Sequence, residues 1–280
     1  MILVDLNQVV ISNLMVGVKR QDIDENLIRH MVMNTLRSYK KKFGLKYGEL
    51  VVCCDNKDYW RRDFFPFYKQ NRKKDRMKSA YDWNLIFNSL TTIKEEMKQF
   101  LPYKVIDVPK CEADDVIAVL TKKYSKSENI LIISSDKDFM QLQRFPNVEQ
   151  YSPRTKAFLK IQDPQSFIKE HIILGDSGDG IPNIKTKDNV FLDDSSRQKT
   201  IRRTSLSEWV LKDKKLWCDD EMLRNYERNS TLIDFENIPD EYVDNIIEAY
   251  DNAGMASKSD LMNYFITYKL KNLMQDLSDY

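Results

Sequence analysis

The stretch ILIISSDKDF at residues 130–139 joins a short apolar run to two closely spaced aspartates. Three other segments, at residues 2–6, 50–54 and 103–108, contain similar apolar runs rich in Val, Ile or Leu. Short runs of this kind are typical of strands that helices cover on both faces. They therefore predict four buried strands.

Helical periodicity fills the intervals between these predicted strands. Apolar residues recur at every third or fourth position over residues 28–43 and 86–101, and residues 112–123 read as a third helix. A hairpin is expected at residues 148–161, where VEQYS, the turn PRTK and AFLKI follow one another. Alternating strands and helices predict an α/β fold with a mostly parallel central sheet flanked by helices.

No strand pattern returns after about residue 165. Helical patterns cover the segments 165–175, 206–217, 220–233 and 240–252 and the tail from Lys258. We therefore expect two domains, an α/β domain at residues 1–168 and a helical domain at residues 169–280.

Aspartates lie at the ends of three predicted strands, where Asp5 ends the first, Asp55 follows the second and Asp136 follows the fourth. In a parallel sheet these ends share one edge, which is where open α/β sheets bind ligands. A helix cap or a turn explains one such aspartate equally well, but three together favour a functional site. Asp138 follows Asp136 at a spacing of two, which aims both side chains the same way if the segment is extended.

Further carboxylates accompany these four. They are Glu112, Asp114 and Asp115 at the start of the third predicted helix, and Asp176 and Asp179 in the turn GDSGDG. Nine carboxylates in one cleft repel one another unless cations offset their charge, and oxygen ligands alone suit Mg²⁺ or Mn²⁺. The pattern predicts two-metal phosphodiester hydrolysis, in which one ion generates hydroxide from water and the other stabilises the leaving oxygen.

The formal net charge of +1 conceals an uneven distribution. Residues 1–215 carry 39 Lys and Arg against 29 Asp and Glu, whereas residues 216–280 carry 5 against 14. The densest basic stretch is RRDFFPFYKQNRKKDRMK at residues 61–78, with aromatic residues among its charges. A charge run is more often a solvated helix face, but this one also suits phosphate contact and base stacking. Beside the acidic cluster, it favours nucleic acid as the substrate.

Composition excludes several classes of protein. The 280 residues are 42% apolar and 31% charged, as in globular proteins, and no apolar run reaches the roughly 18 residues of a membrane span. Asp5 interrupts the apolar start, so we expect no signal peptide. Four cysteines without CxxC spacing predict neither a disulfide framework nor a zinc site, and the cytoplasm is the expected location. The absence of GxGxxG and GxxxxGK[ST] motifs argues against a dinucleotide or P-loop site.

The ordered motifs LVDL, CCDN, YKQNR, EADD, SSDKDF and GDSGDGIP resemble those of the 5′-nuclease (flap endonuclease) superfamily. The likeness is greatest to its bacteriophage ribonuclease H branch and runs over nearly the whole chain. It implies a PIN-like sheet domain followed by a helical domain with a helix–turn–helix-type motif for duplex DNA. It also implies a 5′-to-3′ exonuclease and flap endonuclease that removes RNA primers during DNA replication in the cytoplasm of the phage's host.

The resemblance also assigns roles to individual residues. It places Asp5, Asp55, Asp114 and Asp136 at a first metal site with Glu112 and Asp115 beside it, and Asp138, Asp176 and Asp179 at a second. Two Mg²⁺ ions, which Mn²⁺ can replace, are the implied cofactors. Residues 56–83 would form a helical arch in which Lys69 and Arg72 contact the scissile phosphate. The expected nucleic-acid contacts are Arg61, Arg62, Lys69, Arg72, Lys73, Lys74, Lys185 and Lys187.

One segment departs from the superfamily pattern. Many relatives follow GDxxDNIPG with a Gly-h-Gly hairpin (h apolar), which touches the duplex backbone and often helps to hold a K⁺ ion. Here the chain continues Ile184-Lys185-Thr186-Lys187 without a glycine pair. We expect the backbone amides of this loop, with Lys185 and Lys187, to bind phosphate, and the sequence does not predict a potassium site.

The implied partners are RNA–DNA hybrids, flapped, nicked or forked duplex DNA, and a single-strand-binding protein, with the chain acting as a monomer. Two rival functions stay open. A Mg²⁺-dependent phosphatase would use a strand-end aspartate such as Asp5, but it would leave Asp176, Asp179 and the basic stretch without a role. A DNA-binding protein without catalysis has no need of so many carboxylates, because each one weakens phosphate affinity.

Overall fold

The computed structural model describes residues 1–17, 22–193 and 195–280. Its strands form a six-stranded sheet in the order β3-β2-β1-β4-β5-β6. The strands are β1 (Ile2–Asp5), β2 (Leu50–Cys53), β3 (Lys104–Ile106), β4 (Ile130–Ile133), β5 (Val148–Ser152) and β6 (Ala157–Leu159). Neighbouring strands are parallel except in the hairpin of β5 and β6. The predicted α/β fold with a mostly parallel sheet is confirmed.

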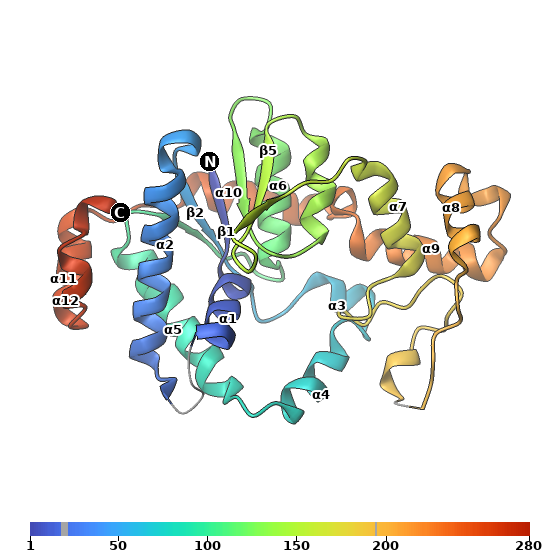
Figure 1. Cartoon of the computed structure of the whole chain (residues 1–280), viewed down its shortest axis with the longest axis horizontal. Helices are drawn as coiled ribbons and strands as arrows, with labels where there is room; N and C mark the ends of the chain where they lie inside the picture. Colours follow the sequence, from blue (N-terminus) through green and yellow to red (C-terminus); the bar gives the residue numbers. More distant parts are fainter. Residues whose placement is uncertain (18–21, 194) are drawn as a thin grey trace. The chain divides into compact units, whose positions relative to one another are not determined.

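Helices fill the intervals between the first five strands (Figure 1). They are α1 (Leu6–Gly17), α2 (Glu25–Tyr47), α3 (Trp60–Phe64), α4 (Gln70–Lys78), α5 (Trp83–Phe100), α6 (Ala113–Tyr124) and the 3₁₀ helix η2 (Asp138–Arg144). The side chains of Asp24 and Asp82 cap α2 and α5 by accepting hydrogen bonds from backbone amides of the first turn. These caps explain why both helices begin where the apolar periodicity begins.

The chain after β6 is helical, as predicted. Its helices are α7 (Pro164–Leu174), η3 (Val190–Leu192), α8 (Arg203–Leu211), η4 (Lys214–Leu216), α9 (Asp220–Ile233), η5 (Phe235–Asn237), α10 (Asp240–Asn252), α11 (Lys258–Thr267), α12 (Lys271–Met274) and η6 (Leu277–Asp279). Among the residues that the structure describes, no helix is long and apolar enough to cross a membrane.

Two compact units divide these elements differently from the expected domains. The sheet unit comprises Met1–Lys57, Tyr81–Lys160 and Glu241–Tyr280, and the helical unit comprises Asp58–Ala80 and Ile161–Asp240. The expected boundary at residue 168 lies close to Lys160, where the segment Tyr81–Lys160 of the sheet unit ends. The segment with α3 and α4, however, groups with the helical unit, and the C-terminal helices group with the sheet.

Helices pack on both faces of the sheet in the sheet unit. Ile2 and Val4 of β1 belong to an apolar cluster with residues of α1, α2 and α5, whereas α6 packs against β1, β2 and β4. Successive strand residues point to opposite faces, so Leu3 faces the other side from Ile2 and Val4 and is equally buried. In Figure 1, α2 and α5 lie on one side of the sheet and α6 lies on the other.

The C-terminal helices join the sheet unit through α2 and α5. Tyr264 and Phe265 of α11 are buried in the same apolar cluster as the sheet. The Tyr264 hydroxyl donates to Glu96 Oε2 at 2.7 Å, and the buried Arg29 guanidinium donates to both oxygens of the same carboxylate at 2.8 Å. This buried polar group explains why α11 packs with the sheet and not with the helices before it.

Candidate active site

The carboxylates predicted at the strand ends share one edge of the sheet. Asp5 ends β1, Asp55 lies two residues beyond β2, and Asp136 lies three residues beyond β4. Because β1 pairs in parallel with both β2 and β4, the three strand ends point the same way. Strands β2 and β3 lie on one side of β1, and β4 lies on the other. The strand order therefore reverses at β1, and ligands of open α/β sheets bind at such a switch point.

Asp5 is the most buried of these three carboxylates, with 5% of the residue exposed. Its Oδ1 accepts a hydrogen bond from the Gln8 amide at 3.1 Å, and its Oδ2 accepts one from Ser134 Oγ at 3.0 Å. Burial, and then the negative charges of Asp55 and Asp136, raise the pKa of Asp5 to about 7. A buried carboxylate with two further carboxylates at the same edge of the sheet offers oxygen donors that fit a hard divalent cation.

Asp55 is held by donors from two elements. Asn7 Nδ2, in the first turn of α1, donates to Asp55 Oδ2 at 2.7 Å. The amide of Ala113, the first residue of α6, donates to Asp55 Oδ1 at 2.9 Å. The positive end of a helix thus stabilises this anion. The sequence reasoning missed Asn7 and Ser134 as supporting residues of Asp55 and Asp5.

The acids at the start of α6 divide into two kinds. Glu112 and Asp115 form a capping box, in which each side chain accepts a hydrogen bond from the other's backbone amide. The contact from the Glu112 amide to Asp115 Oδ2 is 3.0 Å, and both residues are buried. Asp114 is only half-buried. Asp5 is the register partner of Cys53 at the end of β2. Burial and Cys54, and then the charges of Asp5 and Asp114, raise the pKa of the Cys53 thiol.

Asp136 and Asp138 do not project from an extended segment. Asp136 accepts a hydrogen bond from the Asp138 amide at 3.0 Å, and Asp138 is the first residue of the 3₁₀ helix η2. The expectation of two parallel side chains from a strand is therefore wrong at this point, because an Asx-type turn starts the helix at once. Ser134 Oγ accepts from the Asp136 amide at 3.1 Å and links it to Asp5.

The remaining two acids lie in the turn of the helical unit. Asp176 Oδ1 accepts hydrogen bonds from the amides of Gly178, at 2.7 Å, and Asp179, at 3.2 Å. Burial opposes ionisation of Asp176, but the hydrogen bond and charge of His171, whose Nε2 lies 3.5 Å from Oδ2, keep its pKa below the ordinary value. The position of His171 beside this acid could not be read from the sequence.

Asp179 is surrounded by residues of the basic stretch. Its Oδ2 accepts from the Tyr68 hydroxyl at 3.1 Å and lies 3.5 Å from Lys69 Nζ, and its Oδ1 pairs with Arg72. Its backbone carbonyl accepts from the Lys69 amide at 2.7 Å. Lys69 is itself 8% exposed and has a left-handed backbone, with φ of 57°. The structure thus joins both predicted catalytic cations to a predicted metal ligand.

The other basic residues differ in their surroundings. Arg61 is 2% exposed and its Nε donates to the Leu232 carbonyl at 2.9 Å, so the expected phosphate contact at Arg61 is not supported. Its guanidinium, which also lies over the Trp60 ring, ties α3 to α9. Lys73 and Lys187 are exposed. Arg62, Lys74 and Lys185 are half-buried, with Arg62 over the Tyr59 ring and Lys74 Nζ donating to the Leu192 carbonyl.

Two aromatic residues of the basic stretch lie in a core, whereas Phe64 is 50% exposed. Phe65 and Tyr68 are buried in one apolar cluster with Ile172 and Leu232 of the helical unit. The aromatic residues of this stretch were expected to suit base stacking, and the structure shows that these two pack inside the protein. This cluster is the reason that the segment with α3 and α4 groups with α7 and α9.

Comparison with known proteins places this geometry in context. Residues 6–171 match the family described as 5′-3′ exonuclease, N-terminal resolvase-like domain, and residues 164–280 match the family described as T4 RNase H, C terminal. Ribonuclease H of Enterobacteria phage T4 is 35% identical over 289 residues, covering 99% of this chain and 95% of that protein.

Two more distant relatives follow. The flap endonuclease Xni of Shewanella sp. (strain MR-4) is 33% identical over 134 residues, covering 45% of this chain and 48% of that protein. Among solved structures, a phage T5 5′-exonuclease with bound divalent zinc ions matches with a TM-score of 0.64 at 17% identity, covering 89% of this chain and 99% of that one. This last likeness concerns the fold alone.

Proposed function

We propose a metal-dependent 5′-to-3′ nuclease activity for this chain, which belongs to the 5′-3′ exonuclease family and is related over its length to T4 ribonuclease H. The chain is a nuclease, and the predicted resemblance to the 5′-nuclease superfamily and its bacteriophage ribonuclease H branch is confirmed. The finer proposal rests on the strand-end carboxylates Asp5, Asp55 and Asp136, which the parallel pairing of β1 with β2 and β4 brings to one edge of the sheet.

The sheet-edge acids are the proposed ligands of the first ion. Asp5, Asp55, Asp114 and Asp136 supply its carboxylate oxygens, with Glu112 beside them. Two bound Mg²⁺ ions would supply Lewis acidity for water activation and for the leaving oxygen. Hydrogen bonds fix the orientation of two of these ligands. Asp55 accepts from Asn7 and the Ala113 amide, and Asp5 accepts from Ser134. Asp115 also stays assigned beside the first ion, and both Glu112 and Asp115 cap α6. Asp138, Asp176 and Asp179 stay assigned to the second ion.

Lys69 and Arg72 are the proposed electrostatic catalysts. Both are preorganised by hydrogen bonds to the turn that holds Asp179. The backbone amide of Lys69 donates to the Asp179 carbonyl, and Arg72 Nε donates to the Gly178 carbonyl at 3.2 Å. Fixed cations of this kind stabilise charge that develops on a phosphate in the transition state. Both cations pair with Asp179, whose single negative charge offsets part of their positive charge and leaves the pair able to attract a phosphate.

The proposed substrates are RNA–DNA hybrids and flapped, nicked or forked duplex DNA, and the proposed task is removal of RNA primers during replication. Support comes from the names of the relatives, a ribonuclease H and a flap endonuclease. The exposed cations Lys73 and Lys187, with the half-buried Arg62, Lys74 and Lys185, are the proposed backbone contacts. The helix–turn–helix-type motif, the single-strand-binding partner, the monomeric state and the host cytoplasm stay predictions.

A cleavage assay tests the proposal. A 5′-flapped DNA duplex and an RNA-primed DNA hybrid, each labelled in turn at its two ends, are incubated with the protein in Mg²⁺ or in EDTA. We expect short products from the 5′ end in Mg²⁺ and none in EDTA. Hydrolysis of a small phosphomonoester with both nucleic acids left intact would support the phosphatase alternative. Tight duplex binding without cleavage would support a DNA-binding protein.

A further inference from the structure

The loop that follows the GDSGDGIP motif is the segment that lacks the glycine pair of its relatives. This loop, residues 182–188, lies in the helical unit beside α9. Its Ile184 is fully buried in an apolar cluster with Ile173 of α7 and Met222 of α9. The amide of Ile184 donates to the Ile173 carbonyl at 3.1 Å. The loop is therefore anchored at its centre by packing and by a backbone hydrogen bond.

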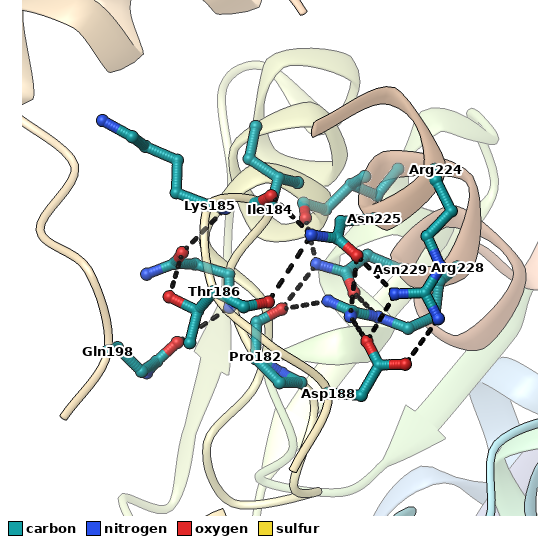
Figure 2. A network of polar contacts seen from close by, with 12 residues as sticks. Pro182, Ile184, Lys185, Thr186, Asp188, Gln198, Arg224, Asn225, Arg228 and Asn229 are labelled. Atoms are coloured by element: carbon teal, nitrogen blue, oxygen red, sulfur yellow. Dashed lines mark hydrogen bonds and ion pairs between the residues drawn. The ribbon is translucent and has the colours of Figure 1, made fainter. Parts of the chain in front are cut away.

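Side chains of α9 donate to three carbonyl oxygens of this loop (Figure 2). The Pro182 carbonyl accepts from Arg228 Nη2 at 2.8 Å and from Asn229 Nδ2 at 2.9 Å. The carbonyls of Ile184 and Thr186 share one donor, Asn225 Nδ2, at 2.9 and 3.5 Å. A single helix thus supplies hydrogen-bond donors to three backbone carbonyls of this loop, which buried carbonyls need.

A buried positive charge stands at the centre of this arrangement. The side chain of Arg228 is 5% exposed and pairs with Asp188 of the same loop. Its Nε donates to Asn229 Oδ1 at 2.9 Å, and its Nη1 also donates to Asn225 Oδ1 at 3.1 Å. Arg224, one turn earlier on α9, binds the same Asp188 carboxylate, but its side chain is 60% exposed.

The backbone amides of the loop are also used inside the protein. The amide of Asn183 donates to Gln198 Oε1 at 2.7 Å, and that of Lys185 donates to Asn183 Oδ1 at 3.0 Å. The amides of Ile184 and Thr186 donate to backbone carbonyls. The expectation that these amides bind phosphate is therefore not supported. The Lys185 side chain, in contrast, extends away from the network (Figure 2).

We propose that Arg228 is a built-in cation that takes the place of a bound K⁺ ion in the loop at residues 182–188 and positions Lys185 for phosphate contact. A K⁺ site needs several carbonyl oxygens that replace the ion's hydration shell, and here the Pro182, Ile184 and Thr186 carbonyls already accept hydrogen bonds. A second cation beside the buried guanidinium would also meet like charge in a region of low dielectric constant. The part that concerns Lys185 rests on the proposed function.

The first test compares cations without any DNA. The melting temperature of the wild-type protein is measured in KCl and in tetramethylammonium chloride at the same ionic strength. An ion bound only by the folded state raises the melting temperature, so the proposal predicts equal values in the two salts. A higher melting temperature in KCl, growing with the K⁺ concentration, would show a bound ion and overturn the proposal. This readout does not depend on nuclease activity.

The second test uses two arginines of the same helix. Arg228→Met removes one of the two donors to the Pro182 carbonyl. Arg224→Met removes an exposed partner of Asp188 and of Asn225 Oδ1 but no donor to a carbonyl of the loop. Affinity for a nicked DNA duplex is measured in EDTA in both salts. We expect Arg228→Met to lose about tenfold in affinity and to recover part of it in KCl only. Wild-type protein and Arg224→Met should stay within about twofold of each other and bind equally in the two salts.

Equal effects of the two substitutions, or a K⁺ requirement in the wild type, would contradict the role of Arg228. A wild-type protein that binds no duplex in either salt would refute the proposed function, and the melting comparison would still decide how the loop is built. If Arg228→Met does not fold, the wild-type comparisons of melting and of affinity carry the decision alone.

Discussion

Asp5 is a carboxyl group that the fold keeps from ionising easily. Its pKa rises from the ordinary 3.8 to about 7 through burial and through the charges of Asp55 and Asp136. Because the folded-state pKa exceeds the unfolded one, the folded protein binds the proton more tightly than the unfolded chain does. The stability that this proton provides is complete below about pH 4 and is lost as the pH rises through about 7.

Asp5→Asn should therefore stabilise the metal-free protein at pH 7.5 and have little effect at pH 4. The asparagine keeps an acceptor for the Gln8 amide and places a donor toward Ser134 Oγ, so the gain reflects the missing charge. The pKa shift sets an upper limit of about 4 kcal/mol. Urea unfolding of both proteins in EDTA across this pH range measures the difference. A variant that is less stable than the wild type at pH 7.5 would contradict the electrostatic account.

Lys69→Ala should slow cleavage more than it weakens binding. Lys69 is buried against Asp179, where it is placed to act on the transition state, and loss of one preorganised donor commonly costs about a hundredfold in rate. Single-turnover cleavage and duplex affinity are measured for Lys69→Ala and for Lys73→Ala, which removes an exposed cation of the same segment. The Lys73 variant should lose affinity only. Equal single-turnover rates for the two variants would remove Lys69 from the catalytic residues.

At the level of single residues, the sequence predicted the carboxylates but not their supports. Asp5, Asp55 and Asp136 could be predicted because apolar runs mark the strand ends and parallel pairing brings those ends together. Asn7 and Ser134 could not, because a hydrogen bond between segments leaves no periodic signal. Arg61 was misassigned for a related reason, since the Leu232 carbonyl that it binds lies far away in sequence.

Among the elements, the turn between α7 and the loop at residues 182–188 depends on one glycine. Gly175 has φ of 68°, and a Cβ atom there would lie 2.4 Å from the Ile181 carbonyl oxygen. Gly175→Ala should therefore destabilise the protein by about 2 kcal/mol or more. Gly254→Ala serves as the control, because a Cβ at Gly254 meets nothing within 4 Å. Similar melting temperatures for the two variants would contradict this account of the turn.

The strands were easier to predict than the short helices. Each predicted strand appears within two residues of its expected bounds, because buried runs of Val, Ile and Leu have few alternatives. Helix α1 was not predicted, because it starts directly after β1, at Leu6, which the predicted strand at residues 2–6 included. The 3₁₀ helix η2 was not predicted either. Asp136, whose side chain accepts the hydrogen bond that starts this helix, was interpreted as a metal ligand in an extended segment.

For the molecule as a whole, the buried ion pair of Arg29 and Glu96, with the Tyr264 hydroxyl, helps to hold α11 against α2 and α5. Glu96→Gln should destabilise the protein by about 3 kcal/mol, because it leaves the buried Arg29 guanidinium with only the partly exposed Glu25 as a carboxylate partner among the described residues. Glu95→Gln is the control, since Glu95 is exposed and pairs only with the surface residue Lys98. Urea unfolding measures both variants. Equal losses would show that the contact with Tyr264 and Arg29 does not fasten α11.

The expected domain boundary illustrates what local patterns leave out. Helical periodicity correctly assigned residues 240–252 and the tail from Lys258 to helices, but periodicity does not say which surface an apolar face covers. Tyr264 and Phe265 cover α2 and α5, and Phe65 and Tyr68 of the basic stretch cover α7 and α9. Both pairings join segments that are more than 100 residues apart, which is why the two units interleave in sequence.

The most direct test of the account is the single-turnover rate of 5′-flap cleavage in Mg²⁺ by Asp136→Asn. Asp244→Asn, which removes an exposed carboxylate of α10, is the matched control. If the sheet-edge acids hold the catalytic ions, the Asp136 variant should lose about a thousandfold or more in rate while it still binds the duplex. The Asp244 variant should cut at the wild-type rate. Cleavage by Asp136→Asn at a rate near that of the wild type would contradict the central claim.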